Sequence, residues 1–289
     1  MRNKTKYYIT KLGISLPRPL KKILRRITPN AFYDSLANSQ VVLVSFPKCG
    51  RSWLRLMICD MVGHQFDNLN IVADTNLLWK VHPLIPYFTI DHDDASLKSP
   101  KDLNRDKSAF ENKKVIFLVR DPRDVIVSWY FQIVKRGSKK WFNGKIKTNS
   151  VADFIDNEYG GLKTIIEFYN IWLRNKKTPK DFLLIKYEDL KNNPYKVLES
   201  INNFCGINTI ISKSSILFAI ENNSFEKLKS RERNQSIDHS AFKTFDTKDS
   251  EAFKVRKGKI GGYVDYLDEK QIVKMNEIIC NELASEIEY

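Results

Sequence analysis

The stretch over residues 41–55 limits the possible fold of this chain more than any other. It begins with a short apolar run rich in β-branched residues, which is typical of a strand buried on both faces of a parallel sheet. A tight turn containing Pro47 and Gly50 follows, and apolar residues then recur at helical spacing over 53–61. The order strand, loop and helix predicts a phosphate or sulfate site, because the first N–H groups of a helix are unpaired and its dipole is positive there.

Two more strands with following helices are predicted further along the chain. The apolar run over residues 115–119 ends at Arg120, and the run over 181–186 ends at Tyr187. Strands that alternate with helices predict an α/β fold, a single domain with a central parallel sheet flanked by helices. Ligands of such sheets bind beyond the carboxyl ends of the strands, where Lys48, Arg120 and Tyr187 are expected to converge.

The segments between and after these units have weaker patterns. Residues 77–83 are expected to be a short extended run, and residues 89–114 a polar loop or lid. Helices are expected after a capping Asp121 with Pro122 in the first position, over residues 161–176 and 213–229, and from Pro194 and Asp268.

Charge divides the chain into two parts. The net charge is +14, and residues 1–30 hold nine of the 48 basic residues and no acidic one. Apolar and basic residues over 20–27 predict a short amphipathic helix, which either lies on an anionic membrane or packs on the domain with its basic face in solvent. We therefore expect a basic arm over residues 1–35 and one domain over residues 36–289.

Cysteine and hydropathy patterns indicate the compartment. The four cysteines form no CxxC pair and no spacing typical of a metal site, so reduced thiols and no bound metal are expected. The sequence contains neither a secretory signal nor an apolar run of membrane-spanning length. A cytoplasmic protein is expected, with possible peripheral membrane contact through residues 1–30 and no nucleic-acid partner.

The loop motif Pro47-Lys48-Cys49-Gly50-Arg51-Ser52-Trp53 differs from the loop of nucleoside triphosphatases, in which the lysine comes late and is followed by Ser or Thr. With its early lysine it resembles the P-loop-like 5′-phosphosulfate loop of sulfotransferases that use 3′-phosphoadenosine 5′-phosphosulfate (PAPS). In this resemblance Arg120 and Ser128 correspond to the segment that binds the 3′-phosphate, and residues 256–258 to the R-K-G loop that closes over it. The implied PAPS site consists of Lys48, Cys49, Gly50, Arg51, Ser52, Trp53, Arg120, Ser128, Tyr187, Phe225, Arg256, Lys257 and Gly258.

The resemblance extends from about residue 40 to residue 262, with one departure. Gly261-Gly262-Tyr263 stands where cytosolic members usually have G-D-W. The departure leaves open how this loop packs and whether it closes over the site.

The resemblance implies transfer of a sulfuryl group from PAPS to an acceptor hydroxyl or amine, with adenosine 3′,5′-bisphosphate (PAP) as product. His82, in Lys80-Val81-His82, resembles the K-x-H base of the family, although some branches use a glutamate. Lys48 is expected to stabilise the leaving oxygen, and Ser128 can engage Lys48 before the substrate arrives. The implied catalytic set is His82, Lys48, Lys80 and Ser128.

Two other classes of function were weighed. A nucleotide-dependent phosphotransferase with a P-loop would need the late G-K-[ST] motif, which is missing. A binder of membranes or nucleic acid would depend on residues 1–30. The acceptor, a small molecule or a saccharide, and the oligomeric state stay open. Basic residues within 89–114 and 135–150, the latter with Trp141 and Phe142 at a possible pocket edge, favour an acidic or polar acceptor slightly.

Overall fold

The computed structural model describes residues 35–69, 73–136, 146, 148 and 150–289, except residues 238, 240–241, 243–245 and 247. The expected amphipathic helix of the basic arm lies outside the described residues. So does most of the loop over residues 135–150, including Trp141 and Phe142.

The centre of the structure is a four-stranded, entirely parallel sheet with the order β2-β1-β3-β4. Its strands are β1 (Val41–Val44), β2 (Phe88–Asp91), β3 (Lys114–Val119) and β4 (Asp181–Lys186). In the register, Val42 of β1 lies between Thr89 of β2 and Val115 of β3. The three strands predicted from apolar runs are confirmed, and the prediction of a single α/β domain around a parallel sheet is confirmed with them.

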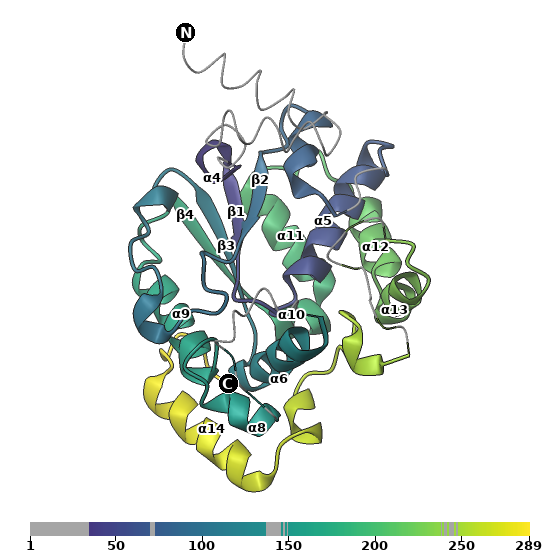
Figure 1. Ribbon diagram of the computed structural model, residues 1–289. Helices are drawn as coiled ribbons and strands as arrows, with labels where there is room; N and C mark the ends of the chain where they lie inside the picture. The colour runs from purple at the N-terminus through teal and green to yellow at the C-terminus, as the bar shows by residue number, and fades with distance from the viewer. Residues whose placement is uncertain are drawn as a thin grey trace, which may run out of the picture.

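Helices flank this sheet (Figure 1). The α-helices are α4 (Ser35–Asn38), α5 (Arg51–Gln65), α6 (Pro122–Phe131), α8 (Val151–Ile155), α9 (Leu162–Arg174), α10 (Tyr187–Asn192), α11 (Pro194–Cys205), α12 (Lys213–Asn222), α13 (Phe225–Arg233) and α14 (Glu269–Glu282). Short 3₁₀ segments are η1 (Thr75–Lys80), η2 (Pro100–Asp102), η3 (Ser108–Phe110), η6 (Ser250–Ala252) and η7 (Gly262–Asp265), and a π-helical turn, η4 (Gln132–Arg136), extends α6. No helix in the described ranges combines the length and the apolar character needed to cross a membrane.

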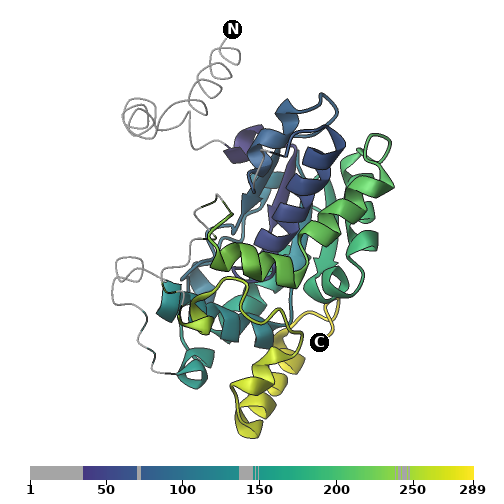
Figure 2. The same ribbon diagram turned by 90° about the vertical axis from the view of Figure 1, so that its right-hand side faces the viewer.

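The apolar faces of the helices form the core on both sides of the sheet. Helix α9 packs its fully buried Trp172 on Phe117 of β3, with ring centroids 5.7 Å apart, and Phe168 of the same helix contacts Phe46. Helices α5 and α12 run side by side in the two ribbon views (Figures 1 and 2), and Asn202 of α11 contacts Met61 of α5. The sheet is thereby covered on both faces, as its continuous apolar strands require.

Two expectations about the segment after α5 were wrong. Residues 77–83 are not extended but belong largely to η1, because the Asp74 side chain accepts a hydrogen bond from the backbone N–H of Asn76 and starts a tight helical turn. The strand next to β1 is β2, which forms within the segment predicted to be a loop or lid. It has four residues that alternate between apolar and polar, so its apolar signal is weak.

The predicted helix over residues 213–229 is two helices, α12 and α13. The break lies at Asn223, whose side chain donates to Asp60 and whose backbone carbonyl accepts from the Trp53 indole at 2.9 Å. In a continuous helix the Asn223 carbonyl would accept a backbone N–H from the next turn, so its bond to Trp53 favours a break at this residue.

A buried ion pair joins the start and the end of the loop that leaves β2, and its lysine packs on α9. The Lys107 ammonium is fully buried, 2.7 Å from the Asp93 carboxylate and over the Trp172 ring. Asp93 and Asp94 both have left-handed backbone conformations, with φ of 49° and 54°, and the Asp91 carboxylate accepts from the Asp93 N–H. The pair therefore holds a strained turn directly behind the end of β2.

We expect Lys107→Ala to destabilise the domain by about 3–5 kcal/mol, because the substitution leaves the Asp93 carboxylate buried without its partner. Urea unfolding followed by circular dichroism measures this loss. Lys101→Ala, which removes an exposed lysine from the same loop, is the control and should cost less than about 0.5 kcal/mol. A loss below about 1 kcal/mol in Lys107→Ala would show that the pair does not hold the turn.

Candidate active site

A cavity of about 580 Å³ lies at the carboxyl ends of the strands. Its walls come from the segments that follow all four strands and from residues 225–262. Ten lysine and arginine side chains of the described residues line it, together with a single carboxylate, Asp124. The cavity is therefore built to receive a strongly anionic ligand.

The loop after β1 forms the floor of the cavity. Lys48 and Gly50 have left-handed backbone conformations, with φ of 75° and 93°. A Cβ at Gly50 would lie 2.6 Å from the Tyr187 ring, so the loop needs glycine there for both reasons. Helix α5 begins directly afterwards at Arg51 and directs its first N–H groups to the loop, as predicted.

The Lys48 ammonium donates a hydrogen bond to the Gln132 side chain at 3.1 Å. It does not bond Ser128, which lies one turn earlier on α6 and lines the cavity. Burial and the nearby Arg136 and Arg256 lower the pKa of Lys48 to about 7. A lysine in this state gains most from an anion that restores its charge.

Cys49, predicted in the same loop, does not line the cavity. Its side chain is fully buried and lies 3.2 Å from the Tyr169 hydroxyl, and burial raises the pKa of the thiol to about 12. The Tyr169 hydroxyl also donates to the Arg120 carbonyl and accepts from the Arg120 N–H. Only the backbone of Cys49 can face a ligand, while Tyr169 ties the ends of β1 and β3 together.

Arg120 lies at the end of β3, against the Tyr187 ring at 4.4 Å. It forms an ion pair with Asp124 at 3.2 Å and donates to the Lys259 carbonyl, and its Nε is buried without a hydrogen-bond partner. Asp124 also accepts from the backbone N–H groups of Gly261 and Tyr263. Thus Asp124 packs the Gly-Gly-Tyr loop, whose packing the sequence left open, against the start of α6.

Residues 254–258 line the opposite wall of the cavity. The fully buried Glu232 accepts from the backbone N–H groups of Lys254 and Val255 and pairs with Arg136 at 3.2 Å. Arg256 pairs with Glu251 at 2.8 Å and lies over the Phe131 ring. The predicted basic loop is thereby held rigidly, through a glutamate that no sequence pattern indicated.

Aromatic side chains from three segments gather at one end of the cavity. Trp53 and Tyr187 meet edge to face at 5.9 Å, and Phe225 joins them with Lys191 over both the Trp53 and the Phe225 rings. Gly258 lies flat on Phe225, because a Cβ there would be 2.6 Å from its ring. These residues were predicted to contact one ligand, and the fold brings them together.

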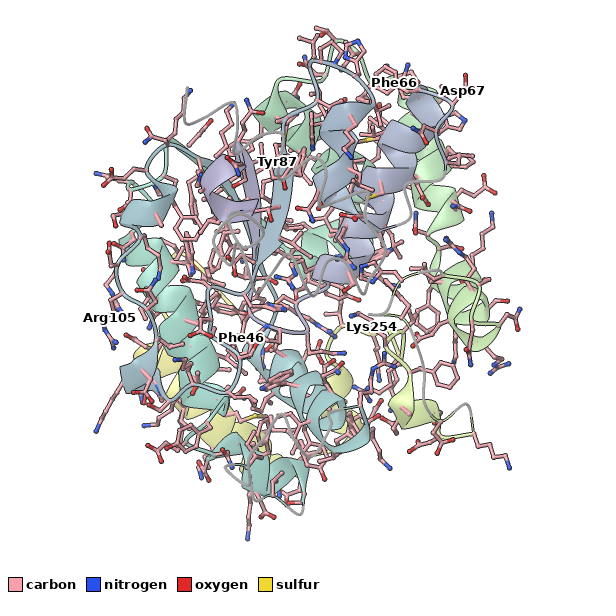
Figure 3. The ribbon with its side chains drawn as sticks, turned by 45° about the horizontal axis from the view of Figure 1, so that its top comes forward. Phe46, Phe66, Asp67, Tyr87, Arg105 and Lys254 are labelled. Carbon is pink, nitrogen blue, oxygen red and sulfur yellow. The ribbon has the colours of Figure 1, made fainter. Side chains whose placement is uncertain are left out.

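Two predicted catalytic residues are not brought to the cavity. His82 stacks on Phe66 with ring centroids 4.9 Å apart, and its Nδ1 accepts from the Leu84 N–H. Phe66 follows the last residue of α5, roughly 20 Å from the cavity end of that helix. Figure 3 shows Phe66 at the far end of the molecule from Lys254, which lines the cavity. Lys80 is exposed in η1. Both residues precede β2 and therefore lie near the amino-terminal ends of the strands, whereas the cavity lies at the carboxyl ends.

The histidine that reaches the cavity is His92, directly after β2. Its Nδ1 lies 2.7 Å from the Ser45 carbonyl, which can only accept, so Nδ1 carries the hydrogen. Its Nε2 then accepts from the Arg51 guanidinium at 2.6 Å. Burial and Arg51 lower the pKa of His92 well below 6.5 and keep the ring neutral. Recognition of β2 in the sequence would have pointed to this histidine, because it directly follows that strand.

The sequence matches the family model of the sulfotransferase domain over residues 38–286. The chain belongs to the sulfotransferase family. It is similar to flavonol 3-sulfotransferase of Flaveria bidentis, with 26% identity over 86% of this chain and 82% of that protein. It is similar to human sulfotransferase 2A1, with 24% identity over 86% of each chain. The family confirms the resemblance found in the sequence.

Solved structures share the fold of this sulfotransferase. A mouse sulfotransferase complexed with PAP has 21% identity and a TM-score of 0.57 over 88% of this chain and 90% of that chain. A retinol dehydratase in complex with androsterone and PAP has 18% identity and a TM-score of 0.58 over 86% and 82%. The enzyme class, a sulfotransferase with PAPS as donor, follows from the family.

The cavity of this sulfotransferase fits PAPS. Arg120 has a buried, unpartnered Nε and Arg51 a buried, unpartnered Nη1, and both residues line the cavity. Gly50 and Gly258 leave room where a side chain would collide with the aromatic group. Cationic hydrogen-bond donors suit the phosphate groups of this nucleotide, and the flat aromatic rings suit its adenine.

We expect Gly258→Ala to weaken PAP binding at least about tenfold, because the new Cβ meets Phe225 and strains a backbone with φ of 57°. Isothermal titration calorimetry with PAP measures the change. Gly206→Ala is the matched control: φ is 74° there, but nothing lies within 4 Å of the added Cβ. This control should bind PAP like the wild type, and equal losses in the two variants would contradict a specific role for Gly258.

Proposed function

We propose that His92 is the general base of this sulfotransferase and that Lys48 stabilises the leaving oxygen. The observation that carries the proposal is the position of His92 at the end of β2. There its Nδ1 donates to the Ser45 carbonyl and its neutral Nε2 lines the cavity. The backbone contact holds the ring in the tautomer that can accept a proton from an acceptor hydroxyl.

Arg51 must move before His92 can act. Its guanidinium now donates to the same Nε2 lone pair that would accept the proton. A phosphate or sulfate at the start of α5 offers Arg51 a charged acceptor, which is a stronger partner than a neutral imidazole. We expect donor binding to turn Arg51 to the anion and to free His92 for the acceptor.

Lys48 supplies positive charge near the bond that breaks. PAPS supplies the sulfuryl group that is transferred to the acceptor oxygen. Lys48 lies in the loop that receives the phosphosulfate, and a full ammonium charge there offsets the negative charge that develops on the leaving oxygen. Gln132 holds Lys48 in the absence of ligand, a role that the sequence assigned to Ser128.

The remaining predicted residues divide between the two ends of the nucleotide. Support for a 3′-phosphate site comes from Arg120, Ser128 and the loop of Arg256, Lys257 and Gly258, which all line the cavity. Support for an adenine site comes from the aromatic group of Trp53, Tyr187 and Phe225. Backbone N–H groups of residues 49–52 and the Ser52 hydroxyl would hold the 5′-phosphate.

The acceptor proposed from the relatives is a small hydroxylated compound. A relative is named for flavonols, and a structural neighbour is in complex with androsterone. A saccharide is the alternative that the sequence left open. Relatives from Arabidopsis thaliana are named cytosolic sulfotransferases, and we propose the same compartment for this chain.

We expect His92→Gln to lower the rate of sulfation by about 10²–10⁴-fold, because glutamine cannot accept the acceptor proton. The assay uses ³⁵S-labelled PAPS and a panel of hydroxyl compounds that includes 4-nitrophenol, methyl glucoside and uronic acids. PAP affinity, measured by calorimetry, should stay within about threefold of the wild type.

His82→Gln is the matched control for this substitution. It removes the same side chain outside the cavity and should keep nearly full activity. A large loss in His82→Gln with an active His92→Gln would restore the assignment made from the sequence. Absence of sulfated product from the whole panel, or of PAP binding, would contradict the proposed function.

We expect PAP affinity to fall as pH rises above 7. The free Lys48 pKa of about 7 rises when an anion binds, so binding takes up a proton at pH 8, where about nine in ten molecules start with a neutral Lys48. Calorimetry in two buffers of different ionisation enthalpy counts this proton. Lys48→Met should take up about one proton fewer, and an equal uptake by both proteins would exclude Lys48 as the group that titrates.

A further inference from the structure

The part of the cavity around His92 holds three cations that the proposed steps leave partly unused. Arg51 reaches His92 with one nitrogen. Arg55 follows one turn later on α5, lines the cavity and is 6% exposed. Lys254 enters from the opposite wall, close enough to His92 to contribute to its lowered pKa.

These three cations lack the carboxylate partners that the other arginines of the cavity have. Arg120 pairs with Asp124, Arg136 with Glu232 and Arg256 with Glu251. No such ion pair of Arg51, Arg55 or Lys254 is found within the described ranges of the chain.

Their nitrogen atoms are correspondingly poorly satisfied. Arg51 Nη1 and Arg55 Nε are buried without any hydrogen-bond partner, and the Lys254 ammonium lies over the Phe242 ring, 5.3 Å from its centroid. Asp91 and Asp74 raise the pKa of Arg51 and Arg55 from a distance, but burial outweighs them and lowers both. Burial and Lys48 lower the pKa of Lys254 well below 10.5. Two buried arginine nitrogens without partners, together with the Lys254 ammonium, indicate a missing anion.

The nucleotide accounts for Arg51, which turns to the donor, but not for Arg55 and Lys254. Its phosphates have Lys48, Arg120 and Arg256 at the positions proposed above. The acceptor hydroxyl, in contrast, must come within hydrogen-bond distance of His92 Nε2, in the same cavity that Arg55 and Lys254 line. Arg55 and Lys254 are therefore left for the acceptor.

We propose that the acceptor carries an anionic group, a carboxylate or a phosphate or sulfate ester, close to the hydroxyl that is sulfated. The inference rests on the proposed function, because that function places the acceptor at His92. Arg55 and Lys254 hold the anionic group from opposite walls, and Arg51 serves the donor after it leaves His92. The loop residues that favoured an acidic acceptor in the sequence are different ones, so this inference has its own support.

The test compares acceptors that differ only in charge. Protein loaded with PAP is titrated with 4-hydroxyphenylacetate or its uncharged amide, and with glucose 6-phosphate or glucose. We expect the anionic member of at least one pair to bind at least about tenfold more tightly, with the pairs distinguishing a carboxylate from a phosphate. The same ratio should appear in kcat/KM with labelled PAPS.

Variants test whether the two cations cause this preference. Arg55→Gln and Lys254→Gln should each reduce the preference at least about fivefold and leave PAP affinity within about threefold of the wild type. Lys248→Gln is the matched control, since it removes an exposed lysine from the same segment as Lys254. It should change neither value.

Two results would overturn the inference. Equal binding of charged and neutral members in both pairs would show that no anionic group is recognised. A loss of PAP affinity in Arg55→Gln and Lys254→Gln as large as the loss of preference would show that these cations serve the nucleotide. If the proposed function is wrong, no acceptor is turned over. Binding of the charged and neutral compounds to PAP-loaded protein tests the anionic site separately, because it needs no turnover.

Discussion

The parallel pairing of four strands is the constraint on which the rest of this structure depends. Because all four strands point the same way, the four segments that follow them meet at one edge of the sheet. Lys48, His92, Arg120 and Tyr187 each follow a different strand and line the same cavity. The pairing of the strands thus determines where the site lies. Substitutions that loosen the carboxyl ends of the strands will therefore also change the positions of the site residues.

Concentrating cations at one edge has an electrostatic cost that the fold offsets selectively. Asp124 and Glu232 each pair with an arginine and at the same time accept backbone hydrogen bonds from the loop over residues 254–263. Charge neutralisation and loop attachment are therefore performed by the same two carboxylates. Cations that have no such partner among the described residues, such as Lys48, Arg51, Arg55 and Lys254, mark places where a ligand must supply the negative charge.

In the proposed mechanism, the contact between Arg51 and His92 links the binding of the two substrates. While Arg51 occupies the Nε2 lone pair, His92 has no free acceptor for a proton. An anionic donor that draws Arg51 away would make the base available only when the sulfuryl group is present. With this order, the enzyme would not deprotonate an acceptor before a sulfuryl donor is bound. The order depends on Arg51.

Residue patterns with local causes were predictable from the sequence. Long apolar runs identified β1, β3 and β4, and the proline and glycine of the loop, the capping Asp121 and the family motifs identified most of the cavity wall. The short strand β2 was missed, because four alternating residues do not differ from a loop in composition. That omission moved the predicted base to His82, on the amino-terminal side of β2, when the histidine after the strand was His92.

By itself the sequence determined the α/β class, the anion-binding loop and the family, since these depend on contiguous residues whose chemistry is local. Only the tertiary structure decided which histidine faces the cavity, that Cys49 turns into the core, and that Glu232 and Tyr169 support the site. Those outcomes depend on pairing between segments far apart in the chain. A histidine after a weak strand becomes a candidate base only when the sheet places that strand beside β1.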